Sequence, residues 1–161
     1  MPQNDKALLM RLKEYGVEFV IIGGVCGALH GLPLVTFDLD VCCPFEVGNL
    51  QKLWNCLVDF HPVHRLTPAK LRFELNEELA TRLKKIYLET DLGKLDCLSE
   101  VAGIGRCSDV IKQSIRYQTT YGEFHMLSLD ALIVAKETTG RQRDLQAARL
   151  LRAIKEKQNN S

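Results

Sequence analysis

The sequence predicts one α+β domain with helices and strands in mixed layers. Its 161 residues fit a single domain, because one domain takes about 150 residues. Amphipathic helical segments alternate with short apolar strand segments along the whole chain. Two candidate hairpins, around Leu92-Gly93 and Tyr121-Gly122, favour a mixed, mostly antiparallel sheet over a purely parallel one. We therefore expect a single domain over residues 1–161.

Composition excludes several classes of protein. A hydrophobic fraction of 46% with 25% charged residues is typical of a globular chain and excludes extensive disorder. The net charge of +1 does not predict a surface that coats a polyanion. The N-terminal segment has no apolar signal-peptide core, and the longest apolar run, residues 19–29, is shorter than the roughly 20 residues of a membrane span. None of the six cysteines forms a C-x-x-C pair, so we expect a cytoplasmic protein with reduced, mostly buried thiols and no membrane contact.

Each expected element follows from its hydrophobic period and its boundary residues. Asn49 and Ser128 are suitable helix N-caps, and Gly140 interrupts the C-terminal helical region. Phe37, Leu39 and Val41 alternate with polar residues and are expected to face the core. Helices are expected over 6–15, 25–30, 49–60, 77–85, 128–139 and 141–157, and strands over 17–22, 37–43, 71–75, 86–90, 94–98, 117–120 and 123–127. The C-terminal helices within 129–157 are expected to pack on the rest of the domain.

A diglycine and two acids form the first chemical motif. Gly23-Gly24 follows an apolar strand, where the backbone can approach a ligand closely, and a helix starting at Val25 favours an anion such as phosphate. Asp38 and Asp40 are two residues apart on the next strand, so they project from the same face and repel each other. A divalent cation relieves this repulsion, and carboxylates with substrate phosphates are ligands that Mg²⁺ prefers.

Asp96 is a candidate third acid, because it stands in an otherwise apolar strand segment. If that strand lies beside the strand of Asp38, three carboxylates converge and suffice for two metal ions about 3.5–4 Å apart. Other interpretations remain open: a D-x-D pair also occurs at sheet edges, a diglycine is most often a turn, and Asp96 could be a salt-bridged structural acid.

Together these motifs resemble the nucleotidyltransferase superfamily, which has the DNA polymerase beta-like fold. Its signature is a hydrophobic strand, Gly followed by Gly or Ser, then Asp-h-Asp, and a later third acid; here it reads Val20 to Gly24, Asp38 to Val41, and Asp96. The Gly-Gly form resembles the minimal bacterial and toxin-like subgroup. The segments Ser128 to Lys136 and Gly140 to Leu145 are similar to that subgroup's C-terminal motif, so the resemblance covers roughly residues 8–155.

The resemblance implies Mg²⁺-dependent transfer of a nucleoside monophosphate from an NTP to an acceptor hydroxyl, with release of pyrophosphate. Asp38, Asp40 and Asp96 are then expected to be catalytic and to bind two Mg²⁺ ions, with Mn²⁺ as an alternative, and Asp96 is a candidate base. The expected nucleotide-binding residues are Gly23, Gly24, Thr36, Lys136 and Arg141. For three of these, alternatives stay open: Lys136 can extend to water, Arg141 can pair with Asp144, and Thr36 can satisfy a backbone group.

The acceptor is left open by the sequence: a small molecule, a tRNA end or a protein side chain. A homodimer or a partner protein could complete the acceptor site of so small a chain. The alternative function is a non-catalytic binding module with the same fold, such as one component of a toxin–antitoxin pair, and a third interpretation is a structural domain whose D-x-D is incidental.

Overall fold

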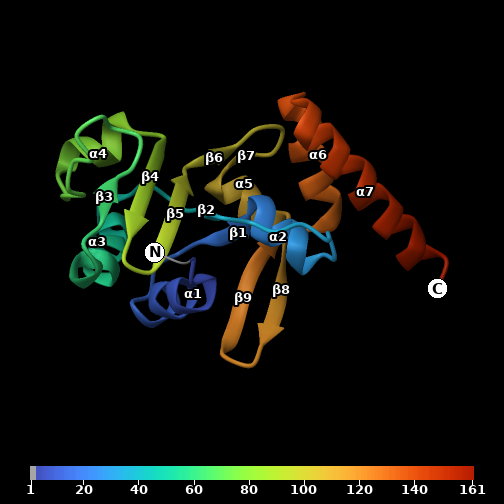
Figure 1. Cartoon of the computed structure of the whole chain (residues 1–161), viewed down its shortest axis with the longest axis horizontal. Helices are drawn as coiled ribbons and strands as arrows, with labels where there is room; N and C mark the ends of the chain where they lie inside the picture. The colour runs from blue at the N-terminus through green and yellow to red at the C-terminus, as the bar shows by residue number, and fades with distance from the viewer. Residues whose placement is uncertain (1–2) are drawn as a thin grey trace.

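A seven-stranded sheet organises the molecule in the computed structural model, which describes residues 3–161; Met1 and Pro2 lie outside the described residues. The strands stand in the order β3-β4-β5-β2-β1-β9-β8 (Figure 1). Their bounds are β1 Val20–Ile22, β2 Leu39–Cys42, β3 Val63–His64, β4 Lys85–Thr90, β5 Gly93–Leu98, β8 Ser114–Thr119 and β9 Gly122–Leu127. A separate short hairpin consists of β6 Glu100–Val101 and β7 Gly105–Arg106.

The sheet is mixed and mostly antiparallel, which confirms the predicted fold class. Neighbouring strands run antiparallel in β1/β2, β3/β4, β4/β5 and β8/β9. They run parallel in β1/β9 and β2/β5. The hairpins β4/β5 and β8/β9 are the two predicted from Gly93 and Gly122. The two parallel pairings join the centre of the sheet to these hairpins, and they could not be predicted from local sequence.

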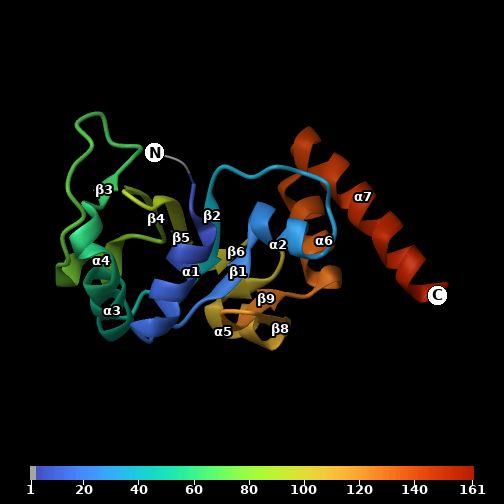
Figure 2. The same ribbon diagram turned by 60° about the horizontal axis from the view of Figure 1, so that its bottom comes forward.

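Helices gather at both ends of the sheet (Figures 1 and 2). α3 and α4 lie near β3 and β4, whereas α2 and the packed pair α6 and α7 lie near β1 and β9, with α7 extending away from the sheet. The bounds are α1 Asp5–Glu14, α2 Gly23–Leu29, α3 Val47–Leu57, α4 Glu77–Arg82, α5 Cys107–Lys112, α6 Leu129–Thr139 and α7 Gln142–Asn159; residues Val58–Phe60 form a 3-10 turn. Within residues 3–161, no helix is both long and apolar enough to cross a membrane.

The core lies between the sheet and the apolar faces of these helices. Leu39 and Val41 of β2 are fully buried, as the alternation predicts. Five of the six cysteines are buried free thiols, and Cys107 is partly exposed, which confirms the expectation of mostly buried thiols. Ser128 caps α6 by accepting a hydrogen bond from the Ala131 amide, and Gly140 ends that helix in a left-handed conformation.

Two predicted strands are wrong in part. The strand expected over 37–43 begins only at Leu39, and Phe37 is 73% exposed and does not face the core. The reason is that β1 pairs with β2 no further than Ile22 opposite Asp40, so the chain before Leu39 has no partner strand there. The segment 71–75 forms only an isolated bridge between Arg72 and Val63.

Asn49 is not the N-cap that its position suggested. α3 begins earlier, at Val47, and Asn49 is buried in the first turn. Its side chain accepts a hydrogen bond from the Glu18 amide at 2.8 Å and donates to the carbonyls of Glu18 and Pro44 at 3.2 and 3.1 Å. Asn49 therefore ties the approach to β1 to the exit from β2, a role that depends on tertiary contacts.

Replacing Asn49 by alanine removes all three hydrogen bonds and leaves partly buried backbone groups without partners. We expect Asn49→Ala to lower the free energy of unfolding by about 2 kcal/mol, which for this chain length corresponds to roughly 4–8 °C in Tm. The control is Asn55→Ala, because Asn55 is exposed on the same helix and its side chain accepts a hydrogen bond from exposed Gln51. Thermal melts that shift equally for the two variants would contradict the role assigned to Asn49.

Candidate active site

The pairing of β2 with β5 brings two of the predicted acids together. The two strands are parallel and in register, with Asp40 directly opposite Asp96. Side chains directly opposite each other on neighbouring strands project from the same face, so both carboxyl groups lie on one side of the sheet. Asp38 precedes β2 by one residue and is partly exposed, whereas Asp96 is almost fully buried. The structure thus brings together the three acids that the sequence singled out.

Mutual repulsion and burial change the ionisation of these acids. Burial, followed by the charges of Asp96 and Asp38, raises the pKa of Asp40 to about 7, and a hydrogen bond between Asp40 and Asp96 adds to this rise. Burial also raises the pKa of Asp96, although Arg65 opposes this effect. The Lys136 charge acts in the opposite direction and lowers the pKa of Asp40. Full ionisation of all the carboxyl groups of this site is therefore unfavourable at neutral pH.

The diglycine provides the space in which Asp40 lies. Gly23 has a φ of +66°, and a Cβ at this position would stand 2.4 Å from Oδ2 of Asp40. A Cβ on Gly24 would stand 2.7 Å from the Thr36 methyl carbon. The helix expected from residue 25 already begins at Gly23, directly after β1, so the diglycine forms the first turn of α2. Glycine is required at 23 both by its backbone conformation and by the carboxylate beside it.

Arg65 is the member of this cluster that sequence reasoning missed. Its guanidinium donates to both carboxylate oxygens of Asp96, with Nε at 3.2 Å from Oδ1 and NH2 at 2.6 Å from Oδ2. The same NH2 group lies 3.8 Å from Oδ2 of Asp38. The guanidinium also lies 5.4 Å from the centre of the Tyr87 ring. Arg65 follows β3 and is 31 residues from Asp96 in sequence, and no local pattern signals such a pair.

The donor chemistry of the site fits a divalent cation, but the present side-chain positions do not form a complete ligand set. Carboxylate oxygens are the ligands that Mg²⁺ and Mn²⁺ take, and a cation would relieve the repulsion that raises the pKa of Asp40. However, over residues 3–161 no three His, Cys, Asp or Glu side chains are grouped so that they could hold a metal ion. Arg65 occupies the oxygens of Asp96, the third acid.

Lys136 and Arg141 both meet at Asp144. Nζ of Lys136 lies 3.4 Å from Asp144, and Nε of Arg141 lies 2.8 Å from its other oxygen, which also accepts from the Thr139 hydroxyl at 2.6 Å. Burial acts to raise the pKa of Asp144, but the Thr139 hydrogen bond and the two cations lower it overall. Lys136 is part-buried and Arg141 is mostly exposed. Asp144 thus pairs with both Lys136 and Arg141, whereas the sequence suggested this pairing for Arg141 alone.

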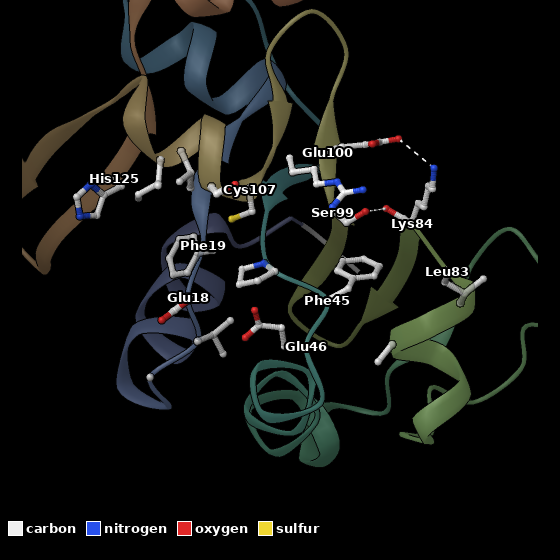
Figure 3. A pocket seen from close by; sticks show the side chains of 18 of the residues that line it. Glu18, Phe19, Phe45, Glu46, Leu83, Lys84, Ser99, Glu100, Cys107 and His125 are labelled. Atoms are coloured by element: carbon white, nitrogen blue, oxygen red, sulfur yellow. Dashed lines mark hydrogen bonds and ion pairs between the residues drawn. The ribbon is translucent and has the colours of Figure 1, made fainter.

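A cavity of about 860 Å³ lies at the other end of the central strands (Figure 3). Its wall includes Glu18 and Phe19 just before β1, Phe45 and Glu46 after β2, and Cys107 at the start of α5. Gly23 and the acids stand at the opposite ends of β1 and β2. The cavity wall contains none of the site residues that the sequence predicts, so the carboxylate cluster and this cavity are separate features.

Comparison with known proteins identifies the fold. No protein-family model matches the chain, and no curated protein matches it in sequence. Among solved structures, the crystal structure of a "putative nucleotidyltransferase" from Thermotoga maritima superimposes with a TM-score of 0.52 at 17% sequence identity. The match covers 97% of this chain and 91% of that protein. At this identity the likeness concerns the fold, and this chain has a nucleotidyltransferase-like fold.

Proposed function

We propose that this protein is a nucleotidyltransferase that moves a nucleoside monophosphate from an NTP to an acceptor hydroxyl. The observation that carries the proposal is the in-register placement of Asp40 beside Asp96, next to Asp38 and against the Gly23 backbone. The fold shared with a protein described as a nucleotidyltransferase supports the same class of reaction. In this reaction a bond forms between the acceptor oxygen and the α-phosphorus, the bond to the β-phosphate oxygen breaks, and pyrophosphate leaves.

The acids would hold divalent cations, Mg²⁺ or Mn²⁺, and neutralise the charge that develops during transfer. Asp38 and Asp40 are the proposed ligands, and Asp96 is the proposed third ligand or the base that takes the acceptor proton. When bound, the cation supplies electrostatic stabilisation of the phosphates and lowers the pKa of the attacking oxygen. The elevated pKa of Asp40 and Asp96 supports the idea that this cluster is built to gain positive charge.

The remaining site residues are proposed to bind the triphosphate. Gly23 and Gly24 lack side chains where the backbone meets Asp40 and Thr36, so the start of α2 lies close to the acids, and its backbone is proposed to contact phosphate oxygens held beside them. Lys136 is part-buried and close enough to the acids to influence Asp40, so its ammonium can reach a phosphate near them. Arg141 is proposed as an outer phosphate contact, because its side chain is largely exposed. Asp144 positions the Lys136 ammonium and the Arg141 guanidinium.

Labelling identifies the acceptor and tests the reaction. The protein, Mg²⁺ and each α-labelled NTP are incubated with cell extract, and we expect label to appear in one acceptor class: a metabolite, a tRNA or a protein. Asp38→Asn and Asp96→Asn are each expected to reduce the transfer rate by about 100-fold or more, because each removes charge that stabilises the transition state. Asp130→Asn is the matched control, since Asp130 is exposed and pairs with Lys155 on the surface. Transfer at wild-type rates by both acid variants would refute the proposal.

The titration of Asp40 predicts a specific dependence of stability on pH. Its pKa is about 7 in the folded protein and about 4 in the unfolded chain, so the folded state binds the proton more tightly. The contribution of Asp40 to stability is therefore most favourable below pH 4 and is lost as the pH rises through 7. Asparagine does not ionise, so the stability of Asp40→Asn does not include this decrease as the pH rises.

We expect the Tm of Asp40→Asn to rise relative to wild type between pH 4.5 and pH 8, by roughly 4–8 °C, which corresponds to about 2 kcal/mol. The comparison is made by calorimetry without divalent cations. A difference in Tm that stays constant across this range would show that the Asp40 carboxyl group does not titrate as described.

Lys136 offers a further test of the nucleotide-binding residues. Lys136→Met keeps much of the aliphatic stem and removes the charge, so we expect the KM for NTP to rise about tenfold. Lys155→Met, which removes a partly exposed lysine of α7 that pairs with Asp130, is the control. Steady-state kinetics that leave KM unchanged in Lys136→Met would exclude a phosphate contact by this residue.

A further inference from the structure

Arg65 and a divalent cation compete for the same carboxylate oxygens. The guanidinium takes both oxygens of Asp96 and approaches Asp38. It is the one Lys, Arg or His side chain within 4 Å of either carboxylate among the residues that the structure describes. A cation that uses Asp96 as a ligand therefore competes with Arg65 for these oxygens.

We infer that Arg65 is a displaceable internal cation: it holds Asp96 and Asp38 in the nucleotide-free protein and contacts the NTP phosphates when a divalent cation takes over these carboxylates. The inference rests on the nucleotidyl transfer proposed above, and it adds a substrate-binding residue and an order of events to that function. Arg65 thereby couples metal binding to nucleotide binding.

The present position of Arg65 is well defined. The Arg65 amide donates to the Tyr87 carbonyl at 3.0 Å, which fixes the backbone beside β4. Tyr87 lies opposite Asp96 in the β4/β5 register, so the ring under the guanidinium and the acid that it binds come from neighbouring strands. The Arg65 side chain is 18% exposed. A planar guanidinium held by two oxygens and a ring places one positive charge in a fixed position beside the two acids.

The same contacts explain how the guanidinium can leave. They involve the two carboxylates and one ring face, so the backbone anchor at Tyr87 can remain while the side chain turns. A divalent cation brings twice the charge of a guanidinium to the acids, and a triphosphate brings its own negative charge beside them. Guanidinium groups form bidentate pairs with phosphate groups and also with carboxylates. Arg65 therefore exchanges one anionic partner for another.

The test compares Arg65→Met and Arg65→Lys with Arg72→Met. Arg72 is a matched control, because it belongs to the same connection between β3 and β4 and is exposed. Mn²⁺ affinity is measured by electron paramagnetic resonance without nucleotide. Affinity for a non-hydrolysable α,β-methylene ATP analogue is measured by calorimetry with Mg²⁺.

For Arg65→Met we expect about tenfold tighter Mn²⁺ binding and about tenfold weaker analogue binding, and smaller changes in the same directions for Arg65→Lys. Arg72→Met is expected to match wild type in both measurements. A purely structural brace cannot give this result, because loss of a brace weakens both affinities together. Unchanged Mn²⁺ affinity in folded Arg65→Met, or a parallel loss of both affinities, would overturn the inference.

If Arg65→Met does not fold, the wild-type protein still decides the question. The Arg65 side-chain Nε–Hε resonance, assigned by comparison with Arg65→Lys, is expected to shift when Mg²⁺ and the analogue are added together, and its constancy would overturn the inference. Failure of the proposed function is distinct: wild type would then bind no analogue and transfer no label. Failure of the inference alone leaves wild-type transfer intact, while Arg65→Met shows either unchanged Mn²⁺ affinity or a parallel loss of both affinities.

Discussion

The parallel pairing of β2 with β5 is the constraint on which the site depends. It places Asp40 opposite Asp96 and makes two acids share one face of a largely apolar sheet. Two carboxyl groups in such a place are costly unless they share a proton or gain a cation. The protein uses both means, because Asp40 has an elevated pKa and Asp96 is paired with Arg65. The repulsion between the acids is thus balanced by groups of the protein itself.

The surrounding structure keeps this balance. Gly23 lets the backbone after β1 lie against the Asp40 carboxylate, where any side chain would clash. At the C-terminal side, Asp144 holds Lys136, whose charge acts on Asp40. The site is therefore assembled from four parts of the chain: the β1–α2 junction, the β2/β5 pair, the segment after β3 that carries Arg65, and the α6/α7 pair. In the proposed function, metal and nucleotide would act on the same oxygens that Arg65 binds in this structure, and for this reason Arg65 is the residue proposed to link their binding.

Features that neighbouring residues alone decide were predicted correctly. The hairpins at Gly93 and Gly122 and the Ser128 cap depend on neighbours a few positions away, and the structure contains all of them. Errors occurred where distant partners decide. Phe37 lies beyond the end of the β1/β2 pairing, and Asn49 serves the backbone of Glu18, 31 residues earlier. No periodicity within one segment carries that information.

By itself, the sequence determined the class of fold and the three acids, because alternation along a strand and an acid within an apolar run are local properties. Tertiary structure alone decided that Asp40 faces Asp96, that Lys136 shares Asp144 with Arg141, and that Arg65 neutralises the acids. The physical reason is that these are interactions between charges brought together by strand register and helix packing, and their energy depends on distances in space, which the order of residues does not contain.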